Sequence, residues 1–149
     1  MEEKTLRVTI PGVPIAKGRP RSVRRGAHIG TYTPKKTADW SKHAVGVITQ
    51  AARGMDLDHL QDGPLALYLL TVAPRPKRLM RKKDLACRIP MDRKPDMDNL
   101  EKAVLDAIVK SSVVRDDSQF CHGMKWHWYA AKNNDEPMVH FVVAPWAWN

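Results

Sequence analysis

Alternating and continuous apolar patterns predict four strands. Residues 6–10 alternate apolar and polar side chains, which is the period of a half-buried strand. Residues 65–72 form an unbroken apolar run that suits a central strand buried on both faces. Residues 120–130 and 138–143 have the composition of two further strands, and the polar segment 132–135 predicts a hairpin connection between them.

Two stretches have the period of an amphipathic helix, at residues 34–53 and 99–110. The expected buried stripes are Trp40, Ala44, Val47, Ile48 and Ala51 in the first helix and Leu100, Ala103, Val104, Ala107 and Ile108 in the second. Thr33 or Thr37 is expected as the N-cap of the first helix, and Gly54 as its C′ residue.

The chain of 149 residues has the size of one domain, because two domains would each have a thin core. The order of strands and helices predicts an α+β fold over residues 1–149, with a mixed β-sheet and two main helices packed on it. No apolar run is long enough for a membrane span, and the N-terminus lacks the pattern of a secretory signal. We therefore expect a soluble, cytoplasmic protein.

The net charge points to a polyanionic partner. Its formal value is +9, and this excess favours nucleic acid over anionic lipid. The charge is concentrated in residues 11–36 and 74–94, for which we predict long functional loops. The candidate phosphate-binding residues are Lys17, Arg19, Arg21, Arg24, Arg25, Lys35 and Lys36 in the first loop and Arg75, Lys77, Arg78, Arg81, Lys82 and Lys83 in the second. The alternative is that these loops only solubilise the protein.

Asp96 and Asp98 are candidate metal ligands at the start of the second helix. Because Pro95 cannot lie inside a helix, we expect the helix to begin near Asp98, with Asp98 as its N-cap. Asp96 then lies on an extended approach, where residues two apart point to the same side. Both carboxylates can therefore converge.

A second pair of aspartates, Asp116 and Asp117, follows the same helix. The segment from Lys110 to Asp117 is long enough to run back along the helix as an extended strand that begins at Val113. We expect it to return Asp117 to the start of the helix, so that three carboxylates share one end.

Three neighbouring carboxylates repel one another unless a divalent cation lies between them, and oxygen-only ligands suit Mg²⁺ or Mn²⁺. Such a cation can polarise a phosphoryl oxygen and activate water, and Lys102, one turn beyond Asp98, can neutralise charge on the scissile phosphate. Alternatively, these aspartates have only a structural role. Asp98, Lys102, Asp106 and Lys110 form an i, i+4 ladder typical of solvated helix faces, and residues 116–118 have an ordinary turn sequence.

A strong resemblance to the RusA-type Holliday junction resolvases is carried by the segment Lys94-Pro-Asp-Met-Asp-Asn-Leu-Glu-Lys-Ala-Val-Leu-Asp-Ala-Ile108, followed by Val113-Val-Arg-Asp-Asp-Ser-Gln119. The stretches Gly12-Val-Pro-Ile-Ala-Lys-Gly-Arg-Pro-Arg21 and Tyr32-Thr-Pro-Lys-Lys-Thr37 are similar to the leader of this family in its phage- and prophage-borne branch. The similar segments extend from about residue 10 to residue 120.

The resemblance implies a homodimeric, Mg²⁺-dependent crossover junction endodeoxyribonuclease, and the oxygen-only ligands allow Mn²⁺ to substitute for Mg²⁺. Such an enzyme resolves four-way DNA junctions by paired symmetric nicks during recombination and repair, in a bacterium or a phage-infected cell, without a small-molecule cofactor. The metal-binding aspartates of the family fall on Asp96, Asp98 and Asp117, and its catalytic lysine falls on Lys102. Asp116 is the neighbour that could take the place of Asp117.

Two other functions remain open. One is a non-catalytic protein that binds branched DNA, in which the aspartates are structural. The other is a nuclease that acts on flaps or forks. A restriction-type Asp…Glu-x-Lys core fits less well, because Glu101 and Lys102 are adjacent and lie in a helix.

Four tryptophans occur in two pairs with strand spacing, Trp126 with Trp128 and Trp146 with Trp148. They either stack on unpaired bases or pack in the core or a dimer interface, and packing is the more common use of large indoles.

Cys87 and Cys121 are too few for a disulfide framework. Cys121, His122 and His127 lack the paired spacing of a zinc site, so we expect none there.

Overall fold

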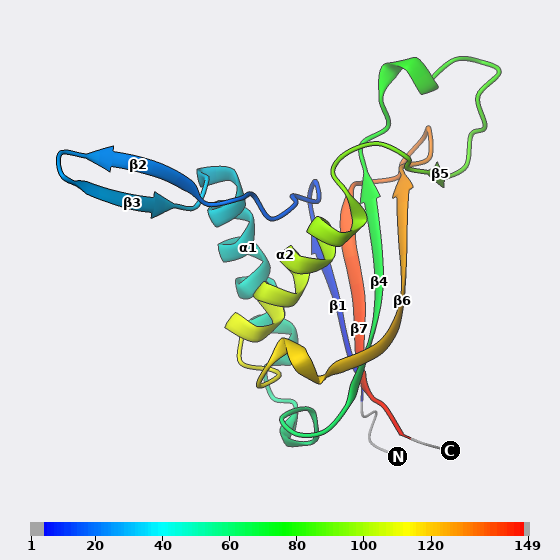
Figure 1. Cartoon of the computed structure of the whole chain (residues 1–149). Coiled ribbons are helices and arrows are strands. Elements are labelled where there is room, and N and C mark those ends of the chain that lie inside the picture. The colour runs from blue at the N-terminus through cyan, green and yellow to red at the C-terminus, as the bar shows by residue number, and fades with distance from the viewer. Residues whose placement is uncertain (1–4, 148–149) are drawn as a thin grey trace.

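A five-stranded mixed sheet forms the body of the protein in the computed structural model, which describes residues 5–147 (Figure 1). The strands are β1 (Leu6–Pro11), β4 (Leu65–Ala73), β5 (Ile89–Pro90), β6 (Phe120–Tyr129) and β7 (Met138–Pro145), in the spatial order β1-β7-β4-β6-β5. β4 is antiparallel to β7 and parallel to β6, and β1 and β5 pair antiparallel at the two edges. The predicted α+β fold with a mixed sheet is confirmed.

β4 is the central strand, as its apolar run predicts. The predicted burial of both faces is only partly confirmed: Leu65, Leu67 and Leu69 are buried, whereas Tyr68 and Leu70 on the other face are half-buried and line an open hollow. The predicted hairpin between the last two strands is wrong, because β4 lies between β6 and β7 and pairs with both. A continuously apolar strand is best shielded from water when it has a partner on each edge.

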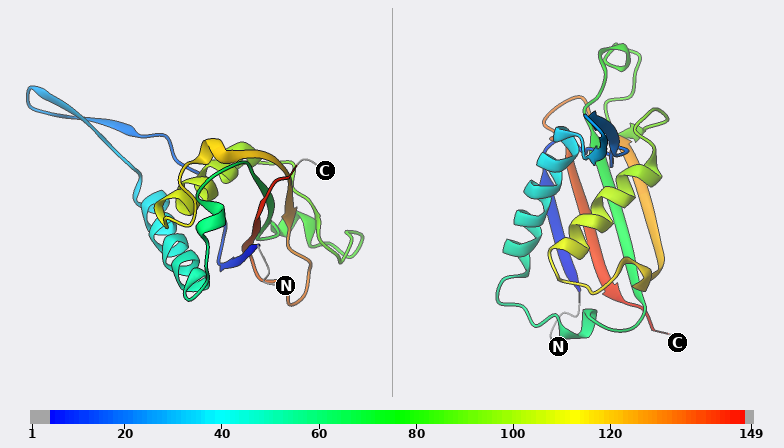
Figure 2. Two further views of the ribbon diagram at one scale, coloured as in Figure 1. Left: turned by 90° about the horizontal axis from the view of Figure 1, so that it is seen from below. Right: turned by 60° about the vertical axis from the view of Figure 1, so that its left-hand side comes forward.

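Two long helices pack on one face of the sheet, α1 (Lys35–Ala52) and α2 (Met97–Lys110) (Figure 2, right). The core between these layers contains Ile10, Ala44, Ile48, Leu67, Leu69, Val104, Ile108 and Phe141. All five residues of the stripe predicted for α2 are buried. The stripe predicted for α1 is wrong at Ala51, which is exposed, because Ala52 packs against the core instead.

The N-terminus of α1 is capped differently from the prediction. Its N-cap is Pro34, with no side-chain capping hydrogen bond, rather than Thr33 or Thr37. The Thr37 hydroxyl instead accepts a hydrogen bond from the backbone N–H of Gly18 at 3.1 Å, which attaches the preceding segment to the helix. Gly54 follows the helix with φ +77°, as a C′ glycine does.

A two-stranded hairpin projects from this body, formed by β2 (Arg21–Arg25) and β3 (His28–Tyr32) (Figures 1 and 2). The prediction that residues 11–36 form an irregular loop is therefore wrong over these strands. Gly26 adopts φ +63° in the turn, a backbone conformation that glycine tolerates without strain. The pairing is local, so the hairpin forms beside the core without contributing to it.

The other elements in the described part of the chain are three short 3₁₀ helices: η1 (Asp58–Leu60), η2 (Lys77–Leu79) and η3 (Asp117–Gln119). Apart from η2 and β5, residues 74–94 form a loop, as predicted. Within residues 5–147, no helix has the length and apolar character that crossing a membrane requires.

Candidate active site

The start of α2 presents two exposed carboxylates. The helix begins at Met97, because the backbone N–H of Leu100 already donates to the Asp96 carbonyl at 3.1 Å. Asp96 is therefore the N-cap, in place of the predicted Asp98, and its side chain makes no capping hydrogen bond. Asp98 lies in the first turn with its side chain 79% exposed. The positive end of the helix dipole favours negative charge at both positions.

Lys125 on β6 reaches this site from the sheet. Its Nζ donates to Asp98 Oδ1 at 2.9 Å and to Glu101 Oε2 at 2.7 Å. The hydrogen bond from Lys125, together with the charges of Lys125 and Lys102, holds the pKa of Asp98 below its usual value. The hydrogen bonds to Glu101 and Asp98 raise the pKa of Lys125. Asp98 and Lys125 are therefore both charged at neutral pH.

Lys125 is absent from the site residues that the sequence predicts, although one signal for it exists. Alternate residues of a strand point to opposite faces, so the pair Trp126 and Trp128 on one face puts Lys125 and His127 on the other. A lysine that faces two amphipathic helices needs an acidic partner, and α2 offers candidates. The strand period alone does not predict which acidic residue of α2 lies within hydrogen-bond distance of Lys125.

Two further lysines belong to the surroundings of the site: Lys102 lies on α2 itself, and Lys17 contacts this helix. Lys102 is exposed one turn after Asp98. The backbone N–H of Lys17 donates to the Asn99 carbonyl at 3.1 Å, and the Lys17 ammonium pairs with Asp106 at 2.7 Å. These contacts attach the segment that leads to the β2–β3 hairpin to the helix that carries the carboxylates.

Asp116 and Asp117 lie before β6, at the start of η3. The Asp116 carboxylate accepts a hydrogen bond from the backbone N–H of Ser118 at 2.8 Å and forms a capping box with Gln119. The bond from Ser118 lowers the pKa of Asp116. Asp116 thus caps a turn, the structural alternative noted above, while Asp117 is exposed.

The two pairs of aspartates lie at different ends of α2. This helix has 14 residues, which at about 1.5 Å per residue makes it about 21 Å long. Figure 1 shows the start of α2 beside the upper half of β6, whereas η3 leads into the lower end of that strand. In the described part of the chain, no three His, Cys, Asp or Glu side chains form a group that could hold a metal ion.

The expected convergence of three carboxylates within one chain is therefore wrong. Val113 and Val114 are 5% and 2% exposed and belong to the core, so the segment after α2 does not form the predicted strand along the helix. Burial of these two valines directs the chain straight through η3 into β6. Only Asp96 and Asp98 share the start of α2.

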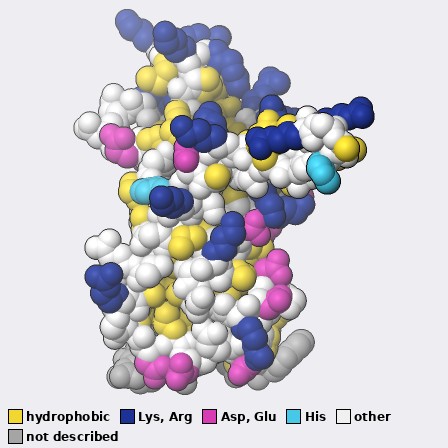
Figure 3. Space-filling view, turned by 90° about the vertical axis from the view of Figure 1, so that its left-hand side faces the viewer, with side chains coloured by type: hydrophobic (Ala, Val, Ile, Leu, Met, Phe, Trp, Pro, Cys, Tyr) yellow, Lys and Arg dark blue, Asp and Glu magenta, His cyan; other side chains and the backbone are white. Residues whose placement is uncertain are grey.

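Basic side chains cover the upper part of the molecule in Figure 3, over the hairpin and the loop after β4. All the candidate phosphate-binding residues are exposed except Arg75, which is half-buried. In the loop after β4, Arg78 donates to the Tyr129 hydroxyl at 3.5 Å and Arg81 pairs with Asp84 at 3.1 Å. The hairpin segment contains no acidic residue between Lys17 and Lys36, so its arginines have no acidic partner within the segment, and Arg24 Nε donates to the Gly26 carbonyl at 3.3 Å.

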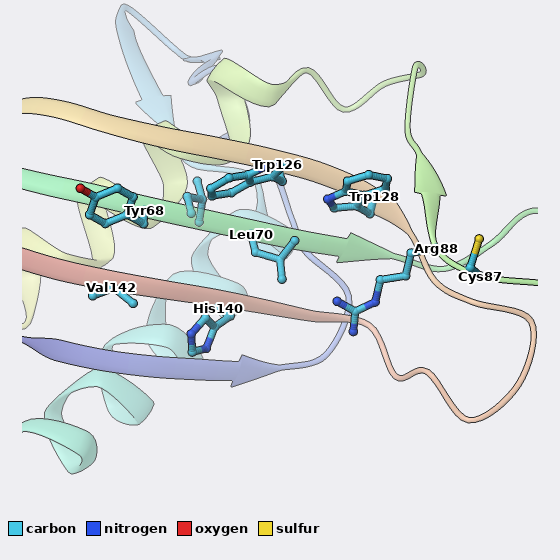
Figure 4. A pocket seen from close by; sticks show the side chains of 9 residues that line it. Tyr68, Leu70, Cys87, Arg88, Trp126, Trp128, His140 and Val142 are labelled. Atoms are coloured by element: carbon cyan, nitrogen blue, oxygen red, sulfur yellow. The ribbon is translucent and has the colours of Figure 1, made fainter.

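Trp126 and Trp128 lie on the sheet face opposite the two helices. They line a hollow of about 680 Å³ in that face (Figure 4). Its other lining residues include Tyr68, Leu70, Cys87, Arg88, His140 and Val142. Because Lys125 faces the helices, the tryptophan hollow and the carboxylates are on opposite faces of the sheet.

The other aromatic and cysteine candidates are dispersed. Trp146 stacks on His122 with ring centroids 4.0 Å apart, and Trp148 lies outside the described residues. His127 is buried and hydrogen-bonds the Thr71 hydroxyl, whereas the Cys121 thiol donates to the Leu65 carbonyl at 3.7 Å. Cys87 and Cys121 are both exposed and form no disulfide.

Comparison with known proteins assigns the chain to a family. A family model described as Endodeoxyribonuclease RusA matches residues 11–139, which is most of the chain. The chain is also 27% identical over 144 residues to the Uncharacterized protein YqaN of Bacillus subtilis (strain 168), and this match covers 93% of the chain and 98% of that protein. The chain therefore belongs to the RusA endodeoxyribonuclease family, as the resemblance of its aspartate-containing segments implies.

Proposed function

We propose that this protein is a Mg²⁺-dependent endonuclease that resolves four-way DNA junctions by paired symmetric nicks, with Mn²⁺ able to replace Mg²⁺. The observation that carries the proposal is the exposed pair Asp96 and Asp98 at the start of α2, with Lys102 one turn away. Membership of the RusA family supports the substrate and the reaction.

The donor atoms at the start of α2 suit a hard divalent cation. Asp96 and Asp98 offer only oxygen ligands, and Asp98 already attracts one cationic group, the Lys125 ammonium. Mg²⁺ is commonly held by one or two carboxylates, with water and substrate phosphates as the other ligands. When bound, such a cation supplies Lewis-acid activation of water and of the phosphodiester.

The remaining groups bind and orient the DNA. Lys102 projects from the turn after Asp98, where its ammonium neutralises charge that develops on the scissile phosphate. Arg21, Arg24 and Arg25 of the hairpin contact phosphates farther along the arms. The attachment of Lys17 to Asn99 and Asp106 holds the base of the hairpin segment beside the cleavage site.

A homodimer supplies the second active site and the missing carboxylate in this proposal. Among the described residues, only the strand β5 pairs with the outer edge of β6, at Trp128 and Tyr129, and the backbone N–H of Met91 donates to the His127 carbonyl at 3.0 Å on the same edge. The edge before His127 has no strand partner among these residues. An unpaired strand edge readily accepts another strand. If two β6 edges pair antiparallel, the start of one strand lies beside the end of the other, and Asp117 of the partner subunit moves toward Asp96 and Asp98.

Two-fold symmetry also suits the reaction. A C₂ dimer carries two identical sites related by the same operation that relates two strands of a four-way junction, so paired nicks can be symmetric. Asp117 is separated from Asp96 and Asp98 within one chain. In this proposal the dimer is therefore needed to supply the third carboxylate as well as to place the two sites symmetrically.

The test is a Mg²⁺-dependent cleavage assay on a four-way junction with Asp96→Asn as the variant. We expect the wild type to make symmetric nicks and Asp96→Asn to bind the junction at least as tightly but not cut it. Asp92→Asn is the matched control, because Asp92 is also an exposed aspartate and lies outside the site. Cleavage by Asp96→Asn at saturating Mg²⁺ would reject the metal site.

The same assay separates the two rival functions. A wild type that binds junctions but cuts nothing with Mg²⁺ or Mn²⁺ would be a non-catalytic branched-DNA-binding protein. Faster cleavage of flaps or forks than of four-way junctions, without paired incision, would indicate the other class of nuclease.

A further inference from the structure

The Lys125 ammonium lies between two carboxylates of α2 and donates a hydrogen bond to each of them. It is 2.9 Å from Asp98 Oδ1 and 2.7 Å from Glu101 Oε2. Asp98 and Glu101 are three residues apart on α2, and Lys125 belongs to β6 of the sheet. The lysine therefore neutralises charge on both carboxylates and ties α2 to β6.

The two hydrogen bonds of Lys125 differ in their exposure to water. The Lys125 and Glu101 side chains are 34% and 31% exposed, whereas the Asp98 side chain is 79% exposed. Water weakens an ion pair more where the partners are more exposed. The bond to Glu101 is therefore the more persistent one, and the bond to Asp98 is the one that another cation can replace.

The backbone around Lys125 leaves this side chain little choice of direction. At Gly123, two residues earlier on the same face, a Cβ would overlap the Leu67 carbonyl oxygen, so β6 runs unusually close to β4 there. On the other side of Lys125, His127 is buried and hydrogen-bonded to Thr71. The strand is thus held on both sides of Lys125, with the lysine directed at α2.

We propose that Lys125 is a resident counter-ion of the metal site, which a divalent cation must displace from Asp98 and which Glu101 then retains. This inference rests on the proposed function, because it takes Asp98 as a metal ligand. Lys125 is a positioning residue here: it holds the carboxylates in place before the metal binds. The hydrogen bonds from Lys125 hold the two carboxylates in place. The positive charge of Lys125 also repels a divalent cation at Asp98 and therefore lowers the affinity of the site for the metal.

The test measures Mn²⁺ binding to the full chain by the electron paramagnetic resonance signal of free Mn²⁺, without DNA. We expect Lys125→Met to bind Mn²⁺ about five-fold more tightly than the wild type, the scale of one screened charge at roughly 5 Å. Lys125→Arg keeps the charge and is expected to stay within about two-fold of the wild type. Lys110→Met is the matched control, since it also removes one positive charge from the protein. Lys110 lies twelve residues after Asp98 on α2, and its distance from Asp98 exceeds the screening length at physiological salt.

A second variant tests the role of Glu101. Glu101→Gln leaves Lys125 with Asp98 as its charged partner and is expected to weaken Mn²⁺ binding at least three-fold. In the Lys125→Met background the same change is expected to weaken binding by less than two-fold. Equal effects of Glu101→Gln in the two backgrounds would mean that Glu101 does not act through Lys125, and would overturn that part of the proposal.

Unchanged or weaker Mn²⁺ binding by Lys125→Met overturns the counter-ion role. Asp98→Asn tests the underlying site separately. If Asp98→Asn binds Mn²⁺ as well as the wild type, the metal site of the proposed function fails, and the counter-ion role fails with it. If Asp98→Asn loses binding but Lys125→Met leaves it unchanged, only the counter-ion role fails. Thermal unfolding checks each variant, and Lys125→Gln replaces Lys125→Met if the latter does not fold.

Discussion

Arg88 and Asp135 form a forked ion pair in which Arg88 Nε and Nη2 donate to the two carboxylate oxygens of Asp135, each at 2.8 Å. The backbone N–H of Ala131 donates to the same carboxylate at 2.7 Å. The pair fastens the basic loop after β4 to the connection between β6 and β7. The hydrogen bonds from Arg88 are the main reason that the pKa of Asp135 falls to about 2.

This ion pair predicts a pH-dependent contribution to stability. Folding lowers the pKa of Asp135 from 3.8 to about 2, so the contribution is fully present above about pH 4 and is lost as the pH falls through 2. We expect Asp135→Asn to reduce the free energy of unfolding at pH 7 by about 1 to 2 kcal/mol. The gap in Tm between wild type and variant is expected to narrow from pH 4 to pH 2. A gap that stays constant over this range would contradict the prediction, and Asp92→Asn serves as an exposed control.

Lys102→Met tests charge stabilisation at the scissile phosphate. Removal of one preorganised cationic donor is expected to lower single-turnover junction cleavage by about 10² to 10³-fold. Junction affinity and Tm are expected to change little, because Lys102 is exposed on α2. A loss of cleavage that is matched by an equal loss of binding would instead make Lys102 an ordinary phosphate contact.

The hairpin arginines are expected to set the salt dependence of DNA binding. Each phosphate contact contributes about −0.9 to the slope of log affinity against log salt, so replacing Arg21, Arg24 and Arg25 by Gln should make the slope shallower by up to about 2.7. Arg53→Gln removes a charge at the far end of α1 and should leave the slope nearly unchanged. An unaltered slope in the triple variant would indicate that the hairpin only solubilises the protein.

Mixing two inactive variants tests whether the partner subunit supplies Asp117. Asp98→Asn and Asp117→Asn are each expected to be inactive alone. If the site combines Asp98 of one protomer with Asp117 of its partner, a mixed dimer contains one intact site. Co-refolding equal amounts of the two variants should then restore about a quarter of the wild-type sites, assuming random pairing. No recovery of nicking, with mixed dimers present, would place all the ligands within one chain.

Replacement of Gly123 and of Gly46 by alanine is expected to change the stability of the fold in opposite directions. A Cβ at Gly123 would overlap the Leu67 carbonyl oxygen, so Gly123→Ala forces β6 away from β4 and is expected to destabilise the fold by about 1 to 3 kcal/mol. A Cβ at Gly46 on α1 meets nothing within 4 Å, so Gly46→Ala should stabilise the helix by up to about 1 kcal/mol. Urea unfolding of both variants checks the signs.

Several elements were predictable because their signals are local. The stripe of Leu100, Val104 and Ile108 repeats with the helical period, and all three residues are buried in α2. The continuous apolar run of residues 65–72 has the character of a central strand, and β4 is central. The aspartate segments were sufficient to indicate the RusA family.

The predictions that are wrong concern structural features that depend on contacts between residues distant in the chain. The strand periods of β6 and β7 do not encode which strand lies beside them, so the insertion of β4 was not predictable from them. Chain length allowed Asp117 to return to the start of α2, but burial of Val113 and Val114 directs it elsewhere. The density of glycine and proline around the hairpin concealed two short strands that, among the described residues, pair only with each other.

Side-chain periodicity and residue chemistry were enough to establish two amphipathic helices, a central strand, a basic surface and the carboxylate pair Asp96 and Asp98. These properties depend on residues close together in the chain. The contact of Lys125 with Asp98, and the position of Asp117 away from both, appear only in the tertiary structure. They depend on the parallel pairing of β6 with β4 and on the packing of α2 across the sheet, because local periodicity carries no record of which distant segments become neighbours.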